Sequence, residues 1–371
     1  MLTNKLNVYY HEKLVGTLVL SKEQRVYFQY DEQWLKNGFP ISPFSLPLKN
    51  ELFTAKKNHF DGLLGVFADS LPDAWGNILL NRILRKNNLN INEINVLDRL
   101  AIIGNSGMGA LTYQPEMLVT DKITEFDLDT LANECQKILT SEYTDSIDIL
   151  YKLGGSSGGA RPKILTTINN EDWIIKFPAH VDAQNIGEME YDYYQCALHC
   201  KIPMSNSRLF PSSITSGYFG TKRFDRVHNQ KVHMISAAAL LEIDFRQPSL
   251  DYNDLMKLTK IVTKNNISDI EQLFRMMCFN VFAHNRDDHA KNFSYLYDET
   301  THRFRLSPAY DLTYSTTYYG EHTTSINGNG ANPTKNDLLQ VGLKAGMNKN
   351  SCMQIIDEIE MIVKQELSKY L

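Results

Sequence analysis

The residues best suited to chemistry lie in the polar segment 283–292, which reads Ala-His-Asn-Arg-Asp-Asp-His-Ala-Lys-Asn. Asp287 and Asn292 stand five positions apart, which is the D-x-x-x-x-N interval of kinase catalytic loops. In phosphoryl transfer a carboxylate accepts or orients the proton of the attacking hydroxyl, while an asparagine and a second aspartate hold magnesium on the phosphates. The interval also occurs by chance, so the elements around it must decide what the segment does.

Two elements would position this segment. An apolar helix is expected over 270–283, and a β-hairpin with a polar turn is expected over 293–306. Because the two ends of a hairpin meet, its closure would bring Asn292 close to Asp311. Asp287, Asn292 and Asp311 would then converge as a catalytic carboxylate and two magnesium ligands. The competing interpretation is a solvated polar turn that follows a core helix.

A second candidate is the glycine-rich stretch 153–163, Leu-Gly-Gly-Ser-Ser-Gly-Gly-Ala-Arg-Pro-Lys. Glycines let backbone N–H groups approach phosphates closely, and a concave nest of such groups favours anions. The stretch lacks the Gly-Lys-Ser/Thr ending of a Walker A loop. Alone, it is more often a flexible turn, but its place between a helical connector and two expected strands favours phosphate binding.

Lys176 lies near the end of an apolar strand expected over 173–177. An isolated lysine there usually caps a sheet edge, whereas in a kinase it neutralises the α- and β-phosphates and pairs with a helix glutamate. The next expected helix carries Glu188 and Glu190. Glu190 is the better candidate because Tyr194 shares its face of the helix.

The segment 220–226 ends what is expected to be the last strand of a first lobe. A chain that passes there from sheet to helices can offer backbone groups to adenine and a carboxylate to ribose. Equally compatible with the sequence is a surface ion pair among Arg223, Asp225 and Arg226.

The composition narrows the classes of protein to which this chain can belong. The 371 residues are 43% hydrophobic, enough for a large core, and the net charge of -5 argues against direct binding of nucleic acid phosphates. The amino terminus lacks a signal-peptide pattern, and no apolar run approaches the roughly 20 residues that span a bilayer. The five cysteines are odd in number and scattered, which indicates free thiols. A cytoplasmic location is expected, with no membrane association.

The order of expected elements indicates an α+β protein in four parts: 1–115, a small α+β subdomain; 116–150, a charged connector with one helix over 127–139; 151–226, a kinase N-lobe with the glycine-rich loop and a sheet; and 227–371, a helical C-lobe with the catalytic loop.

In the first part, the alternation of apolar residues predicts a hairpin over 6–20 and a further strand over 26–30. Pro72 is expected near a helix start with Asp73 in the first turn. A loop over 104–109 then precedes a short strand.

These motifs occur in the order found in the HipA-type toxin kinases, which the chain resembles over nearly its whole length. The segments that carry the resemblance are 67–73, 103–113, 159–163 (Gly-Ala-Arg-Pro-Lys), the strand containing Lys176, 223–226 (Arg-Phe-Asp-Arg), 287–294 and 307–311 (Ser-Pro-Ala-Tyr-Asp). One departure is Asp288, where relatives often have glycine.

The resemblance implies a two-lobed, protein-kinase-like fold of the phosphatidylinositol-kinase type, with ATP and Mg²⁺ as cofactors. Asp287 would be the catalytic acid/base, assisted by Lys176 on the phosphates, with Asn292 and Asp311 as magnesium ligands. Lys222 and Phe224 would offer backbone contacts to adenine. The residues implied at the nucleotide are Ser157, Gly158, Gly159, Ala160, Lys176, Glu190, Lys222, Phe224, Asp225 (near the ribose), His289 (near the phosphates), Asn292 and Asp311.

The resemblance also implies partners and regulation. The substrate would be serine or threonine on a protein, with aminoacyl-tRNA synthetases as the family's known targets. A small helix-turn-helix antitoxin of the HipB type would neutralise the kinase and provide an indirect link to DNA. Ser156, with Ser157 beside it, would be autophosphorylated, and the added phosphate would repel ATP and disorder the loop.

Two other functions remain open from the sequence. One is a metal-dependent hydrolase that uses His284, Asp287, Asp288 and His289 as ligands. The other is a catalytically silent module that keeps the kinase fold to bind a nucleotide or a partner. Magnesium-dependent ATP turnover that is lost with Asp287 would favour the kinase. Zinc binding without nucleotide would favour the hydrolase, and nucleotide binding without phosphate transfer would favour the silent module.

Overall fold

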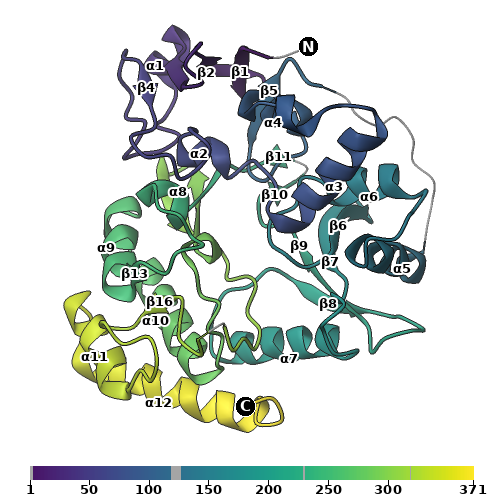
Figure 1. Ribbon diagram of the computed structural model, residues 1–371. Coiled ribbons are helices and arrows are strands. Elements are labelled where there is room, and N and C mark those ends of the chain that lie inside the picture. The colour runs from purple at the N-terminus through teal and green to yellow at the C-terminus, as the bar shows by residue number, and fades with distance from the viewer. Residues whose placement is uncertain (1–2, 118–126, 229, 318) are drawn as a thin grey trace. The chain divides into compact units, whose positions relative to one another are not determined.

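The computed structural model describes residues 3–117, 127–228, 230–317 and 319–371 (Figure 1). The chain forms two compact units. The first comprises Met1–Gly187, Arg208–Ile235 and Ala239–Glu242, and the second comprises Glu188–Ser207, Ser236–Ala238 and Ile243–Leu371. These units do not follow the four-part division expected from the sequence, which stays a prediction.

The first unit begins with an antiparallel sheet of order β4-β3-β2-β1-β5. Its central hairpin pairs Lys5 with Val19 and Tyr10 with Lys13, so the hairpin expected over 6–20 is confirmed. Alternate residues of β1 are buried, which gives the sheet one core face. The strands are β1 (Lys5–Tyr10), β2 (Lys13–Leu20), β3 (Val26–Tyr30), β4 (Phe53–Thr54) and β5 (Leu111–Gln114).

Short helices accompany this sheet. The helix expected after Pro72 is present, but it begins at Ala74, so Asp73 is its N-cap residue and not part of its first turn. The Asp73 side chain makes no cap hydrogen bond, because it is directed to another loop described below. The helices are α1 (Glu32–Asn37), α2 (Gly65–Ala68), α3 (Ala74–Lys86), η1 (Ile91–Glu93) and α4 (Val96–Ile103).

A second sheet of order β6-β7-β9-β8 follows in the same unit. The pair β6–β7 is antiparallel and places Lys163 directly opposite Lys176. Asn169 and Asn170 form the turn between them with positive φ angles, a conformation that asparagine tolerates well. The strands are β6 (Lys163–Ile168), β7 (Glu171–Lys176), β8 (Ser207–Phe210) and β9 (Tyr218–Lys222).

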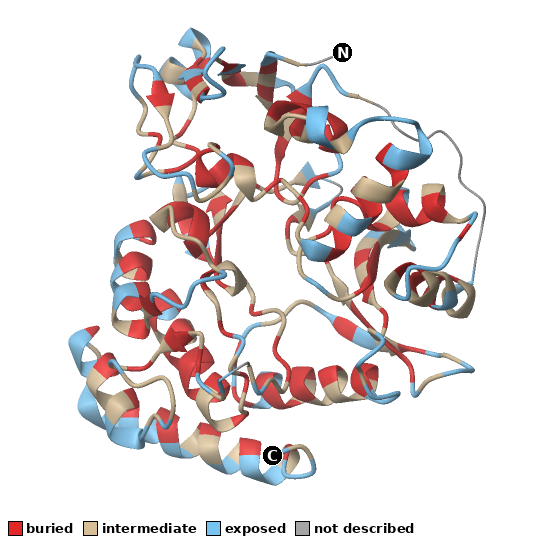
Figure 2. Cartoon of the chain, in the orientation of Figure 1, coloured by how far each residue is buried: buried red, intermediate tan, exposed pale blue. Residues whose placement is uncertain are grey.

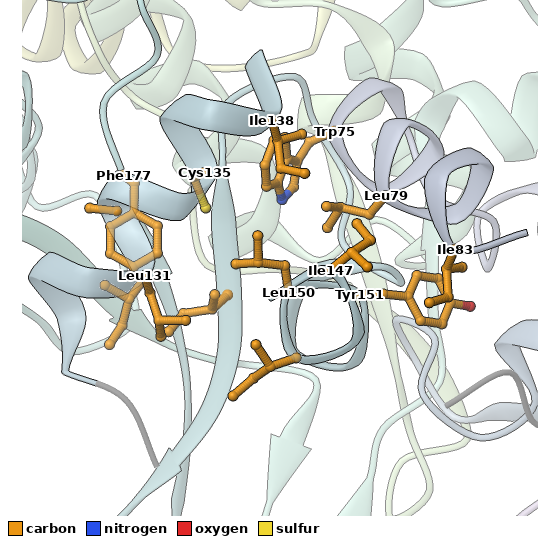
Figure 3. Packing of buried hydrophobic residues seen from close by; sticks show 14 of the residues in the cluster. Trp75, Leu79, Ile83, Leu131, Cys135, Ile138, Ile147, Leu150, Tyr151 and Phe177 are labelled. Atoms are coloured by element: carbon orange, nitrogen blue, oxygen red, sulfur yellow. The ribbon is translucent and has the colours of Figure 1, made fainter. Parts of the chain in front are cut away.

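The described residues of the connector hold two helices, whereas one was expected. Besides α5 (Leu128–Leu139), the chain forms α6 (Ile147–Gly154), which includes the first two residues of the expected glycine-rich loop. Part of the connector, 118–126, lies outside the described residues. Figure 3 shows why α6 is stable: it packs Ile147 and Leu150 against Trp75 and Leu79 of α3 in one apolar core.

The second unit is mainly helical, and its helix caps are strong. Asn266 and Asn348 each accept backbone N–H groups at the start of α10 and α12, which explains where both helices begin. Buried positions recur along these helices (Figure 2). The helices are α7 (Ile186–His199, whose first two residues belong to the first unit), α9 (Tyr252–Val262), α10 (Ile267–Phe282), α11 (Lys335–Lys344) and α12 (Lys349–Glu366).

The hairpin expected after the catalytic loop is confirmed as the antiparallel pair β14 (Ser294–Asp298) and β15 (Arg303–Leu306), with Tyr295 opposite Leu306. A short parallel pair joins β13 (Leu250–Asp251) to β16 (Thr324–Ser325). The remaining short elements are β10 (Arg226–Val227), β11 (Gln230–Lys231), β12 (Met234–Ser236), α8 (Ala237–Leu241) and η2 (Ala290–Asn292).

All five cysteines are buried free thiols, as the sequence indicated. Within the described ranges, no helix combines the length and apolar character needed to cross a membrane.

Candidate phosphoryl-transfer site

The catalytic loop of the second unit starts where α10 ends. His284 adopts a left-handed conformation with φ of 51°, and the Asn285 N–H donates to the Asn280 carbonyl at 2.9 Å. This tight turn leaves the Asp287 side chain exposed. The Asn292 side-chain amide donates through Nδ2 to the Asp287 carbonyl at 2.7 Å, so the two predicted residues lie together.

The closed hairpin links the neighbours of Asn292 and Asp311. The Ser307 N–H donates to the Ser294 carbonyl at 2.9 Å, which continues the pairing beyond the strands. The Tyr310 hydroxyl donates to the Lys291 carbonyl at 2.7 Å and shares a 2.6 Å hydrogen bond with Ser294 Oγ. Residues adjacent to Asn292 and to Asp311 are therefore bonded to each other, which is the arrangement that the hairpin predicted.

The donor set of this loop fits a hard cation. Nδ2 of Asn292 is used on the Asp287 carbonyl, so Oδ1 is the amide atom suited to a metal. Asp311 would add a carboxylate, and magnesium prefers such oxygen ligands. Asp311 has a positive φ of 57°, an uncommon conformation for a residue other than glycine. Their assignment as metal ligands stays a prediction.

His289 packs beside this loop within the second unit. Its ring lies 5.1 Å from that of Phe245 between centroids, and its Nδ1 is buried without a hydrogen-bond partner. A buried polar atom without a partner is costly, and a ligand can satisfy it. The predicted place of His289 near a nucleotide is compatible with this orphan nitrogen.

Asp288 differs sharply from its neighbour Asp287, since only 1% of it is exposed. Its carboxylate accepts hydrogen bonds from Tyr252, His322 and Thr324. A carboxylate used in this way is not a ligand of a hydrolytic metal. In the part of the chain that the structure describes, no group of three or more His, Cys, Asp and Glu side chains is arranged to hold a metal. The ligand set of the hydrolase alternative is therefore not assembled.

His284, another member of that alternative set, has a lowered pKa. Burial lowers the pKa of its imidazole, and the positive charge of Arg286 lowers it further.

The glycine-rich loop of the first unit packs against the start of α3. Ser156 and Ser157 are 6% and 1% exposed, and their hydroxyls donate to the carbonyls of Ser106 and Gly154 at 3.0 and 2.6 Å. The Gly159 N–H donates to Asp73 Oδ2 at 2.8 Å. A carboxylate thus occupies one of the N–H groups that was expected to be available for a phosphate.

Removing the Asp73 carboxylate should loosen this loop. A hydrogen bond to a charged group contributes about 1.5–3 kcal/mol, so Asp73→Ala should speed amide hydrogen exchange at Gly159 by roughly tenfold or more. Exchange followed by mass spectrometry measures this. The control is Asp148→Ala, which removes from α6 the carboxylate that forms an ion pair with Lys86 of α3. Unchanged exchange at Gly159 would show that the carboxylate does not hold the loop.

Two lysines lie side by side across β6 and β7 in the first unit. Lys163 is only 7% exposed, and its Nζ donates to the Gly158 carbonyl at 2.6 Å, which ties the glycine-rich loop to the sheet. Nζ of Lys176 lies 5.7 Å from the centroid of the Phe219 ring. Glu190 is buried in the second unit, and its pairing with Lys176 stays a prediction.

The segment after β9 holds a buried ion cluster where the sequence left open a surface ion pair. Asp225 is fully buried and accepts from Arg223 Nε and Nη2 at 2.9 and 2.8 Å and from Arg226 Nη1 at 2.8 Å. It also accepts from the Gly109 N–H at 2.7 Å. This carboxylate already accepts four hydrogen bonds from three residues, and a contact of Asp225 with a ribose stays a prediction.

The two residues expected at adenine, Lys222 and Phe224, are sequence neighbours of this cluster. Lys222 forms an ion pair with Glu171 and lies over the Trp173 ring at 5.7 Å, so its side chain faces the sheet. The Arg223 N–H donates to the Asp172 carbonyl at 2.8 Å, which fixes the backbone between Lys222 and Phe224. Backbone contacts from these two residues remain compatible with the structure.

The contacts of two residues in this site, Asp73 and Asp288, could not be predicted from the sequence. Asp73 precedes a helix and was assigned to that helix, and nothing in its neighbourhood indicates a bond to Gly159, 86 positions away. Asp288 was grouped with Asp287, because sequence alone does not show which of two adjacent aspartates faces solvent.

A mixed α+β chain with a β-sheet subdomain followed by a glycine-rich loop, a sheet and a helical unit has a kinase-like fold. A solved structure supports this: the HipA toxin of Shewanella oneidensis MR-1, determined with HipB and its operator DNA, aligns with a TM-score of 0.73. The alignment covers 98% of this chain and 90% of that one, at 16% identity.

Sequence comparisons identify the family. Residues 6–114 match the HipA N-terminal domain, and residues 155–366 match the HipA-like C-terminal domain. Two proteins of Sinorhizobium fredii are also similar. "Putative kinase Y4mE" is 26% identical over 86% of this chain and 79% of its own length. "Putative kinase Y4dM" is 26% identical over 48% and 47%. The chain belongs to the HipA family, a family of serine/threonine protein kinases.

Proposed function

We propose that this protein transfers the γ-phosphate of ATP to a serine or threonine of another protein. The observation that carries the proposal is the closed catalytic loop, in which Asn292 is bonded to the Asp287 backbone and Tyr310 is bonded to the backbone of Lys291. These two bonds, at the base of the hairpin β14–β15, support a common site for the proposed catalytic carboxylate and the two predicted metal ligands, which phosphoryl transfer would require.

In the proposed reaction, the exposed carboxylate of Asp287 accepts the proton of the substrate hydroxyl while the hydroxyl oxygen forms a bond to the γ-phosphorus. The bond between that phosphorus and the bridging oxygen breaks, and ADP leaves. Asn292 and Asp311 would hold Mg²⁺, which neutralises negative charge on the phosphates when it is bound.

The first unit would supply the groups that bind the nucleotide. Lys176 would neutralise the α- and β-phosphates, and the N–H groups of 157–160 would contact phosphate oxygens. In the structure Asp73 accepts the Gly159 N–H, so ATP would have to displace this carboxylate. The backbone of Lys222 and Phe224 would contact adenine.

Autophosphorylation of Ser156, with Ser157 as the neighbouring alternative, is part of the proposal. Both hydroxyls are buried and hydrogen-bonded, so the loop would have to leave its seat against α3 before either could react. A dianionic phosphate could not return to so buried a position, and modification would therefore inhibit nucleotide binding.

The proposed partners follow from the family. The structural relative was determined with HipB and operator DNA, and we propose that this chain likewise belongs to a toxin–antitoxin pair with a helix-turn-helix antitoxin. Its net charge of -5 supports contact with DNA only through that partner. A cytoplasmic aminoacyl-tRNA synthetase is the first substrate to test.

The test is a lysate incubated with radiolabelled ATP and magnesium, with wild type compared against Lys176→Met. Loss of one preorganised positive charge should lower kcat/KM for ATP on the order of 100-fold. Lys369→Met, which removes an exposed lysine on the other unit, is the matched control and should keep wild-type activity. Wild-type protein that binds ATP yet labels no protein would reject the kinase in favour of a silent nucleotide-binding module.

A further inference from the structure

The buried carboxylate of Asp288 joins the catalytic loop to three other parts of the second unit. Oδ2 accepts from the Tyr252 hydroxyl and from His322 Nδ1, both at 3.0 Å, and Oδ1 accepts from the Thr324 N–H at 3.1 Å. The Asp288 carbonyl also accepts from Thr324 Oγ1. These partners come from α9, from the segment before β16 and from β16 itself. We refer to Asp288, His322 and Thr324 as the clasp.

A second set of hydrogen bonds ties the clasp to the helix that precedes the catalytic loop. Asn280 of α10 donates to the Tyr252 hydroxyl at 2.9 Å, and Asn285 donates to Asn280 Oδ1 at 2.9 Å. All four side chains, Asp288 included, are at most 2% exposed. Buried polar groups are costly when they lose their hydrogen bonds, so the network favours the geometry that keeps these bonds, although Asn285 Oδ1 itself is buried without a partner.

The backbone on the other side of Asp287 is held by the same segment. The N–H and the hydroxyl of Thr323 both donate to the Arg286 carbonyl, at 2.9 and 3.0 Å. Arg286 and Asp288 are therefore bonded to adjacent residues, Thr323 and Thr324. Asp287 therefore lies between two fixed points of the backbone, and the residue itself is exposed.

The partners of Asp288 in the clasp, His322 and Thr324, lie at the end of the chain segment that begins at Asp311. Residues 312–317 follow this predicted metal ligand in the chain, and residues 322–324 lie at Asp288. Thr324 then pairs with Leu250 in the parallel bridge of β13 and β16, next to the start of α9. Asp288 thus binds one end of this segment, and the other end carries Asp311, a predicted metal ligand.

We propose that Asp288 is a positioning residue for phosphoryl transfer: through the clasp it fixes the backbone of Asp287 against the end of the segment that starts at Asp311. The inference rests on the kinase activity proposed above. The cost of burying a charge is offset by three donors at one carboxylate, which an amide or an apolar side chain does not reproduce.

Asp288→Asn tests the proposal. The substituted amide keeps the shape but presents an NH₂ group to donors, so the loop should shift while the nucleotide-binding groups of the first unit stay intact. A displacement of about 1 Å at a catalytic group can cost on the order of 100-fold in rate. We expect kcat to fall by roughly 10- to 100-fold and KM for ATP to change by less than about threefold.

Three further variants separate positioning from general stability. His322→Gln keeps a donor and should retain kcat within about threefold, whereas His322→Leu removes the donor and should lose activity as Asp288→Asn does. Asp269→Asn alters another buried carboxylate, one that accepts from the Leu306 N–H outside the clasp. It should leave kcat at 25 °C unchanged.

Amide hydrogen exchange at 284–288 and 322–325 gives a readout independent of activity. Exchange should rise in Asp288→Asn and in His322→Leu but not in Asp269→Asn. Unchanged exchange and kcat in Asp288→Asn would overturn the clasp, and so would equal losses of kcat in Asp288→Asn and Asp269→Asn. Wild-type protein without phosphotransfer would reject the kinase proposal, while the exchange measurement would still decide whether the clasp exists.

Discussion

Replacing Asp287 with asparagine is expected to lower kcat for phosphate transfer by about 10²- to 10⁴-fold, the usual contribution of a positioned acid–base group. An amide has nearly the same shape as the carboxylate but does not accept the substrate proton. The Asn292 bond goes to the backbone carbonyl of Asp287, so the substitution leaves that bond in place. Binding of ATP should therefore survive, and the loss should fall on kcat.

Single-turnover labelling with radioactive ATP measures the chemical step directly, and a fluorescent ATP analogue measures binding. Asp254→Asn, an exposed position on α9, is the matched control and should behave like wild type. Because the Asp287 side chain is exposed, the melting temperature of the variant should change little. A variant that transfers phosphate at the wild-type rate would show that Asp287 is not the proton acceptor.

The catalytic loop could be predicted because its geometry is local. Asp287 and Asn292 lie within one short loop that ends in η2, and the hairpin 293–306 is set by alternating apolar residues and a polar tip. Once that hairpin closes, Asp311 follows at a fixed distance along the chain. The Tyr310–Lys291 bond that secures it spans 19 positions, a short loop for folding to close.

The glycine-rich loop could be located from the sequence, but the hydrogen-bond partners of its residues could not be predicted. Ser156 is bonded to a residue 50 positions away and Gly159 to one 86 positions away. Glycine content indicates only that backbone N–H groups can approach an acceptor. Whether the acceptor is a phosphate or the carboxylate of Asp73 depends on tertiary packing that spacing does not encode.

The same limit applies to charged residues that the fold buries. Arg223, Asp225 and Arg226 are close in sequence, which permits a surface ion pair as well as a buried cluster. Burial is decided by loop 107–109, whose carbonyls accept from both arginines. No local pattern links that loop to residues more than 100 positions later.

Removing the acid of this cluster should be strongly destabilising. Asp225→Ala leaves two guanidinium groups buried against each other and also leaves the Gly109 N–H without its acceptor. Breaking a buried ion pair by deleting one partner costs about 3–5 kcal/mol. Urea unfolding followed by circular dichroism should show this loss at neutral pH, and hydrogen exchange should rise first at 107–109.

The pH dependence of this loss follows from the pKa of Asp225. Burial raises the pKa of its carboxyl, but the charges of Arg223 and then Arg226 more than offset this, so the pKa lies below its ordinary value. A carboxyl with a lowered pKa stabilises the folded state above its unfolded pKa of about 3.9 and loses that contribution as pH falls through the folded pKa. The difference in unfolding free energy between wild type and Asp225→Ala should therefore stay constant from about pH 5 to 8 and shrink in more acidic solution.

The control is Asp298→Ala, which removes an acid at an exposed hairpin turn and should lower the free energy of unfolding far less at every pH. Equal losses for the two variants would mean that the cluster does not stabilise the first unit.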